Sequence, residues 1–117
     1  MKTVRIIFSP EAEEVYNYLN EEAEHSKIEK SILNAINKKA ELIKQNPHYG
    51  DAVAKNLIPL RYKLRYGVTN LFRVELPDYW RMLYTLTEGS NEIEIIAFVL
   101  SLVDHPTYDK MFGYRKK

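Results

Sequence analysis

The chain has 117 residues, of which 45% are hydrophobic and 28% are charged, with a formal net charge of +1 and no cysteine. This length fits one domain over residues 1–117 with its own core, and the composition is that of a soluble globular protein, away from the disordered and membrane classes. The missing cysteines exclude a disulfide framework, a thiolate nucleophile and a cysteine zinc site.

The chain begins with a pattern typical of a strand followed by a helix. Residues 3–8 alternate between strongly apolar and other side chains, which predicts a short strand with one buried face. Ser9 and Pro10 then predict a helix start, because serine caps a helix and proline fits its first turn. We expect this first helix to run to about Glu24.

A second helix is predicted directly after the first. Ser26 is followed three residues later by Glu29, the spacing of a capping box. Apolar residues then recur at helical spacing until Asn46 and Pro47, where the proline stops the helix. Two helices joined so closely predict a helical hairpin.

The second half of the chain predicts a sheet. Residues 48–68 are interrupted by Gly50, Pro59 and Gly67, and the cluster Leu57, Ile58 and Leu60 is too short to define an element, so we expect mostly loop there. Alternation with a period of two then predicts three strands joined by short turns. These strands cover residues 70–76, 81–87 and 93–103, and the last of them is apolar on both faces, as in a central strand.

This order predicts an α+β fold in two layers. It consists of an N-terminal strand, a two-helix hairpin and an antiparallel three-stranded meander, with the helices packed on one face of the sheet. Side chains alternate along a strand, so Arg73 and Arg81 are expected to project from the other, open face. The C-terminal tail, with His105 and Tyr108, is expected to lie beside them.

Charge is unevenly distributed along the chain. Between residues 9 and 45 there are eight acidic residues and five lysines, whereas residues 55–81 carry six cations and two acids. Such asymmetry predicts one basic face that binds a polyanion and one solvated face or partner face. Scattered solvated charge is the alternative interpretation.

The sequence also bears on location. No apolar run reaches the roughly 18 to 20 residues of a membrane span, and acidic residues begin too early for a secretory signal. We therefore expect a cytoplasmic protein without membrane contact.

Two motifs resemble a known family. The run NLFRVELPDYWRMLYTL, residues 70–86, is followed by an apolar strand and by DHPTYDKMFGYR, residues 104–115. Together with the helical hairpin, these motifs resemble the RelE/ParE toxin superfamily, particularly archaeal RelE-like and HigB-like members. The resemblance implies a RelE-like fold and the toxin of a type II toxin-antitoxin system, an endoribonuclease that cuts mRNA on the ribosome. It also implies a cognate small antitoxin protein as partner.

The resemblance implies roles for individual residues. Arg81 matches the strand arginine that contacts the scissile phosphate, and Arg73 lies near a basic position of the preceding strand. His105, Tyr108 and Asp109 match the variable C-terminal acid and base group. The chain departs from RelE proper at Glu75, where a second strand lysine is found in that protein.

The residue types suit this chemistry. Cleavage of RNA without a metal requires removal of the 2′-hydroxyl proton, stabilisation of charge at the phosphate and protonation of the leaving oxygen. Arginine binds phosphate oxygens through two parallel hydrogen bonds and stays charged. Histidine changes its charge near neutral pH, and Tyr108 or Asp109 is expected to share proton transfer with His105. For RNA binding we expect Arg61, Lys63, Arg65 and Trp80.

Other interpretations remain open at this level. Arg81 is also placed to pair with Glu75 or Asp78, His105 to end a strand, and Tyr108 to form part of a hydrophobic lid. A protein of this fold that only binds a partner, as ParE-type toxins act on gyrase, and a plain RNA-binding module are the alternative functions. The three histidines lack metal-ligand spacing, so we expect neither a metal nor another cofactor.

Overall fold

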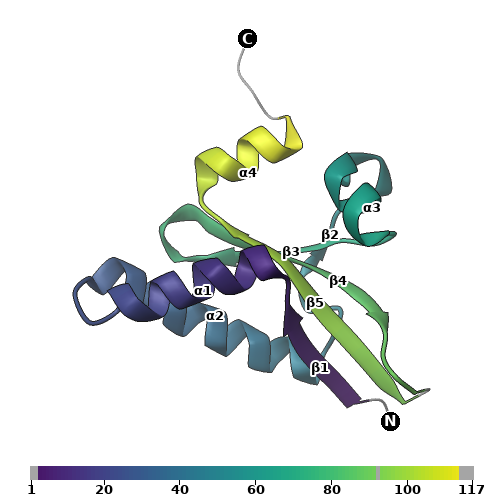
Figure 1. Ribbon diagram of the computed structural model, residues 1–117, viewed down its shortest axis with the longest axis horizontal. Helices are drawn as coiled ribbons and strands as arrows, with labels where there is room; N and C mark the ends of the chain where they lie inside the picture. The colour runs from purple at the N-terminus through teal and green to yellow at the C-terminus, as the bar shows by residue number, and fades with distance from the viewer. Residues whose placement is uncertain (1–2, 92, 114–117) are drawn as a thin grey trace.

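The computed structural model describes residues 3–91 and 93–113, which form an α+β fold with a five-stranded mixed sheet. In chain order the strands are β1 (Thr3–Phe8), β2 (Asp51–Ala52), β3 (Phe72–Leu76), β4 (Trp80–Glu88) and β5 (Glu94–Val103). The four α-helices are α1 (Pro10–Glu22), α2 (Lys27–Gln45), α3 (Leu60–Tyr66) and α4 (His105–Phe112). Two short 3₁₀ turns are η1 (Lys55–Leu57) and η2 (Pro77–Tyr79). Figure 1 shows α1 and α2 side by side along the sheet, whereas α3 and α4 lie apart from them, with α4 next to the C-terminus.

The sheet has the order β1-β5-β4-β3-β2. β1 runs parallel to β5, and each of the other neighbours is antiparallel. The predicted meander of three consecutive strands is therefore confirmed, and β5 is a central strand between β1 and β4. β2 was not expected, and it pairs with β3 through only two residues.

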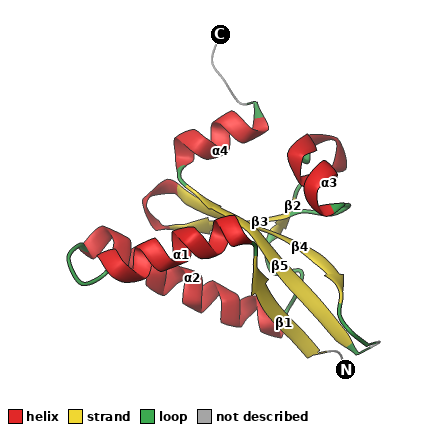
Figure 2. Ribbon diagram, viewed as in Figure 1, coloured by secondary structure: helices red, strands yellow, loops and turns green. Residues whose placement is uncertain are grey.

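The expected helix starts are confirmed. The Ser9 hydroxyl accepts a hydrogen bond from the backbone N–H of Ala12 at 3.0 Å, and Ser26 caps α2 in the same way through Glu29. α1 ends at Glu22, two residues before the expected end, and α2 ends directly before Asn46. The predicted helical hairpin is thus present (Figure 2).

Two separate cores cover the two faces of the sheet. The larger one lies between the sheet and the α1–α2 hairpin, and it includes Phe72, Val74, Met82 and Tyr84. The smaller core lies on the opposite face, where α3 and α4 contribute Tyr62 and Tyr108 against Leu83 and Leu100 of the sheet. The expectation of an open second face is therefore wrong, because two short helices cover part of it.

The expectation that residues 48–68 are mostly loop is also wrong, since they contain β2, η1 and α3. The sequence of α3 does not show the apolar pattern of a buried helix, because Tyr62 is its only buried residue, while Leu60 and Leu64 are exposed. Its end is nevertheless marked in the sequence. Gly67 adopts the left-handed conformation at φ 63°, as is usual for a glycine that terminates a helix.

Candidate functional site

The β3–β4 hairpin brings the two predicted catalytic arginines to one face. In its register Glu75 lies opposite Arg81, and Arg73 lies opposite Leu83. Side chains of directly opposite residues share a face, and this face is the one turned away from α1 and α2. The predicted projection of Arg73 and Arg81 from that face is therefore confirmed, with Glu75 between them.

Glu75 forms ion pairs with both arginines. Its carboxylate oxygens lie 3.4 Å from Nε of Arg73 and 3.3 Å from Nε of Arg81. Both Nε atoms are buried and make no directed hydrogen bond among the described residues, so these contacts are electrostatic. Asp51 adds a longer contact to Arg73, at 3.7 Å. The two arginines are thus balanced by two exposed carboxylates, those of Glu75 and Asp51, and an incoming anion has to displace them.

Tyr108 of α4 supports both guanidinium groups from below. Its side chain is buried, with 3% of the residue exposed, and its hydroxyl accepts a hydrogen bond from Nη1 of Arg73 at 3.0 Å. The guanidinium carbon of Arg81 lies 4.8 Å from the centroid of the same ring, within cation–π distance. The hydrogen bond to Tyr108 raises the pKa of Arg73, so this arginine stays charged. Tyr108 therefore positions the arginines and lies beneath the surface.

The arginines differ in accessibility. The Arg81 side chain is 13% exposed, and its Nη1 donates a hydrogen bond to the backbone carbonyl of Tyr79 at 2.6 Å. The Arg73 side chain is 33% exposed. Arg81 is thus held rigidly in the hairpin, as a preorganised donor requires, whereas Arg73 presents more of its surface to solvent.

His105 and Asp109 occupy the first turns of α4, one helical turn apart. Nε2 of His105 lies 3.2 Å from Oδ2 of Asp109, and both side chains reach solvent. A carboxylate in this position orients the imidazole ring. The ring of Tyr79 lies beside His105, with 6.1 Å between the ring centroids. Through this contact the acid and base pair of α4 adjoins the hairpin that carries Arg81.

Asp104 sets the position of α4. Its carboxylate caps the helix by accepting a hydrogen bond from the backbone N–H of Thr107 at 3.0 Å. Hydrogen bonds from the Thr107 side chain and backbone lower the pKa of Asp104 below its usual range. Asp104 was not among the predicted site residues, although an aspartate followed by Pro106 and Thr107 is a sequence signal for a helix start.

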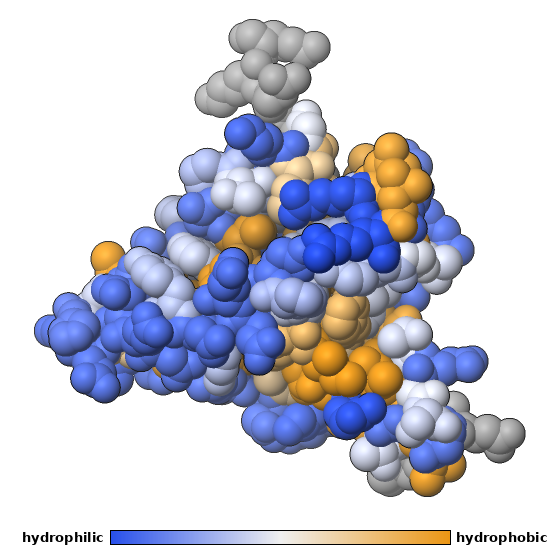
Figure 3. All heavy atoms as spheres, in the orientation of Figure 1, coloured by the Kyte–Doolittle hydropathy of each residue, from blue (hydrophilic) through white to orange (hydrophobic). Residues whose placement is uncertain are grey.

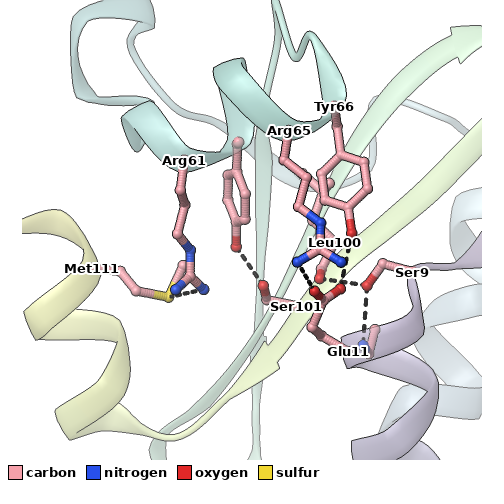
Figure 4. A network of polar contacts seen from close by, with 10 residues as sticks. Ser9, Glu11, Arg61, Arg65, Tyr66, Leu100, Ser101 and Met111 are labelled. Atoms are coloured by element: carbon pink, nitrogen blue, oxygen red, sulfur yellow. Dashed lines mark hydrogen bonds and ion pairs between the residues drawn. The ribbon is translucent and has the colours of Figure 1, made fainter.

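The cations of α3 are largely engaged within the protein (Figure 4). Arg65 and the hydroxyl of Tyr66 both contact the Glu11 carboxylate of α1, while Arg61 reaches the sulfur of Met111 at 3.7 Å. A hydrogen bond from its own backbone and a second from Tyr66 lower the pKa of Glu11. These contacts fasten α3 to α1 and α4.

The predicted RNA-binding residues are therefore not brought together at one point. Lys63 is exposed on α3, and no shared ligand site joins Arg61, Lys63 and Arg65 to the arginines of the hairpin among the contacts of the described residues. Trp80 packs against the larger core, on the face of the sheet opposite Arg73 and Arg81. This position agrees with the alternative that Trp80 is a packed hairpin residue.

The surface hollows and the acidic and histidine side chains of the described residues add no further group to this site. A hollow of about 380 Å³ between α1, α3 and β5 is lined by α3 side chains and Glu11, and its lining includes neither hairpin arginine. Within residues 3–91 and 93–113, no three His, Asp or Glu side chains gather closely enough to hold a metal ion. No helix in the described part of the chain is long and apolar enough to pass through a bilayer.

Comparison with protein-family models, with curated proteins and with solved structures finds no match to this chain. What the site can do follows from its own groups. Arg73 and Arg81 offer two guanidinium groups in fixed positions, of which Arg73 is the more exposed, and the His105–Asp109 pair offers a proton carrier on the adjacent helix. Together they suit a phosphodiester whose charge increases during reaction.

Proposed function

We propose that this chain is the toxin of a type II toxin-antitoxin system, a ribosome-dependent endoribonuclease of the RelE type that cuts mRNA in the cytoplasm. The observation that carries the proposal is the shared support of two arginines by Tyr108, with the His105–Asp109 pair on the same helix. The resemblance of the hairpin and tail motifs to RelE-like proteins supports the same activity.

The proposed reaction uses no metal or cofactor. The 2′-oxygen of one nucleotide attacks the neighbouring phosphorus, the bond to the 5′-oxygen breaks, and a 2′,3′-cyclic phosphate and a free 5′-hydroxyl result. The proton of the 2′-hydroxyl leaves to a base, and the 5′-oxygen gains a proton as it departs. His105 carries one of these protons, with Asp109 orienting its ring.

The arginines stabilise the charge that develops on the phosphate oxygens. Arg81 is fixed by the Tyr79 carbonyl and the Tyr108 ring, so little reorganisation is required when the phosphate charge grows. Arg73 is more exposed and makes the first contact with the RNA backbone. Glu75 competes with the phosphate for both arginines, and its exposed side chain must turn outward when RNA binds.

RNA held by a ribosome extends beyond this centre. In the proposal, Lys63 and Arg61 of α3 contact its backbone, while Arg65 does so only when it leaves Glu11. Trp80 contributes through the packing of the hairpin rather than by direct contact. The ribosome supplies the remaining orientation of the substrate.

The proposed antitoxin is a small acidic protein. No acidic residue occurs from Ala52 to Val74, a segment that contains α3 and five cations. Leu60 and Leu64 of α3 are 66% and 77% exposed and are four residues apart, so they share one face of the helix. Figure 3 shows this hydrophobic patch over α3 beside strongly hydrophilic side chains. An acidic amphipathic segment complements such a surface.

The same leucines favour the second candidate function, a protein of this fold that acts by binding a partner without cleavage. Primer extension on an mRNA translated by purified ribosomes, with and without the protein, separates the two. Cuts at codon spacing that require the protein are expected. An uncut message, with folded protein bound to ribosomes or not, contradicts the nuclease and leaves partner binding as the function.

A further inference from the structure

The tip of the β3–β4 hairpin holds an exposed aromatic side chain on an unusual backbone. Asp78 and Tyr79 both lie in the left-handed region, with φ of 60° and 63°. Aspartate tolerates this region because its short polar side chain can hydrogen-bond locally, whereas a bulky residue such as tyrosine is strained there. Glycine or asparagine at position 79 would relieve that strain, so a tyrosine at this position costs stability.

The strained backbone is held in place by the arginine of the candidate site. Nη1 of Arg81 donates to the Tyr79 carbonyl at 2.6 Å. The Tyr79 side chain gains little from burial in return, because the residue is 74% exposed and its described ring contact is the tilted one with His105. Packing therefore does not explain the tyrosine, whereas a ligand that covers the ring does.

We propose that Tyr79 is a stacking platform for one unpaired nucleobase of single-stranded RNA, next to the phosphate held by Arg81 and Arg73. This inference rests on the proposed function, and it adds the part of the substrate that the arginines do not contact. Nucleobases stack on exposed aromatic rings, and the neighbouring phosphate needs a cation a few ångströms away. Tyr79 ends η2 and Arg81 is the second residue of β4, so the two groups are only two residues apart at the hairpin tip.

The hydrogen bond from Arg81 to the Tyr79 carbonyl links the ring that would stack on a base to the guanidinium that would bind the phosphate. It fixes the peptide of Tyr79, and hence the direction of the ring, through the same guanidinium that faces the phosphate. A base on the ring and a phosphate on the arginine would then be bound with a set spacing. Tyr79 would therefore determine which nucleotide lies beside the scissile bond.

Binding of a short, fluorescently labelled RNA with 2′-O-methyl groups, which cannot be cleaved, tests the inference at low salt by anisotropy. We expect Tyr79→Asn to weaken binding about tenfold, because one base–aromatic stack is worth about that factor. Tyr79→Phe should bind like the parent, since it keeps the ring. Tyr18→Ala is the matched control, because Tyr18 is an exposed tyrosine of α1 far from the hairpin in sequence.

Probes that lack one base at a time, with the backbone intact, locate the stack. At one position the abasic probe should bind the parent as weakly as the complete probe binds Tyr79→Asn, and the two losses should not add. Because asparagine tolerates the left-handed region, the melting temperature of Tyr79→Asn should equal or exceed that of the parent. A lower melting temperature would mean that the ring is a structural contact, and the inference would be overturned.

Further outcomes of these experiments test the stacking of a base on Tyr79 and separate it from the nuclease proposal. Equal affinity of parent and Tyr79→Asn, a loss that persists in full on every abasic probe, or no binding of the probe by the parent overturns the stacking platform. If binding depends on the ring while ribosomes programmed with mRNA remain uncut, the nuclease proposal fails and the nucleobase site stands. If mRNA is cut equally well by parent and Tyr79→Asn and their affinities agree, only the stacking inference fails.

Discussion

Nη1 of Arg73 donates a hydrogen bond to the buried hydroxyl of Tyr108 at 3.0 Å. This bond joins the hairpin to α4, and the ring of the same tyrosine lies under Arg81. Tyr108→Phe keeps the ring and removes the hydroxyl that accepts the hydrogen bond from Arg73. We expect it to lower the free energy of unfolding by about 1 kcal/mol and to slow cleavage through the loss of a fixed Arg73.

Urea denaturation and single-turnover cleavage measure these two effects. Tyr18→Phe, a change to an exposed tyrosine of α1, is the control and should alter neither. If Tyr108→Phe matches the parent in both measurements, the hydroxyl does not position Arg73, and Tyr108 is only part of a hydrophobic lid.

Glu75 lies between the two arginines and restrains them. Glu75→Gln keeps the size of the side chain and removes the charge that competes with phosphate. We expect the affinity for RNA at low salt to rise by about threefold to tenfold, because an exposed ion pair is worth up to about 1 kcal/mol and a phosphate no longer has to displace it. Anisotropy titration with the uncleavable RNA measures the change.

Glu24→Gln is the matched control, since Glu24 is exposed beyond the end of α1. Both variants change the net charge by the same amount, so a general charge effect would raise both affinities equally. Equal affinities for the two variants would show that the Glu75 carboxylate does not compete with RNA for the two arginines.

The number of phosphate contacts that α3 makes can be measured from the salt dependence of RNA binding. For a single strand, each phosphate contact contributes about 0.7 to the slope of log K against log salt. We expect Lys63→Gln to reduce the slope by about this amount, because Lys63 is exposed on α3. Lys38→Gln on α2, in the other layer of the fold, should leave it unchanged. Equal slopes for parent and Lys63→Gln would place the RNA elsewhere.

Asp104 makes the docking of α4 sensitive to acid. Its pKa is lowered in the folded protein by the hydrogen bonds from Thr107, so its carboxylate stabilises the fold above the ordinary value of 3.8. This stabilisation is lost as the pH falls through the lowered value, when the carboxylate gains a proton. Asp104→Ala should lose about 1 kcal/mol at neutral pH through the missing cap.

Asp104→Asn separates the cap from the titration. It should keep most of the stability at neutral pH and lose less than the parent on acidification below about pH 4, since asparagine caps without a charge. Urea denaturation from neutral to acidic pH gives the comparison. An acid dependence that is the same in parent and Asp104→Asn would contradict the role of this carboxylate.

Much of the larger layer could be predicted from local patterns. The alternation around Arg73 and Arg81 predicts their shared face, because strand side chains alternate whatever the rest of the chain does. The caps at Ser9 and Ser26 predict two helices, because their hydrogen bonds are made within one turn. The pairing of Arg81 with Glu75, kept open as an alternative, follows from hairpin register and is confirmed.

The second layer could not be predicted, because its contacts join distant segments. α3 is held by the contacts of Arg65 and Tyr66 with Glu11, some 55 residues away, and it has too few buried residues to show a helical period. The burial of Tyr108 depends on where α4 packs, which no spacing within the tail reveals. A tail that carries acid and base groups and a tail whose tyrosine packs beneath two arginines have similar sequence patterns. The sequence therefore does not distinguish them.

The most direct test of the proposed site is the single-turnover rate at which the protein cuts mRNA on programmed ribosomes, measured for Arg81→Met. Methionine retains the length that packs beside Tyr108 and removes the charge. Arg5→Met, at an exposed arginine of β1 paired with Glu94, is the control. Melting temperatures should show that both variants fold. If Arg81 stabilises the charge at the scissile phosphate, Arg81→Met should cut at least about 10²-fold more slowly than the parent, with much less change in binding, while Arg5→Met cuts normally. A folded Arg81→Met that cuts at the parental rate would contradict the site.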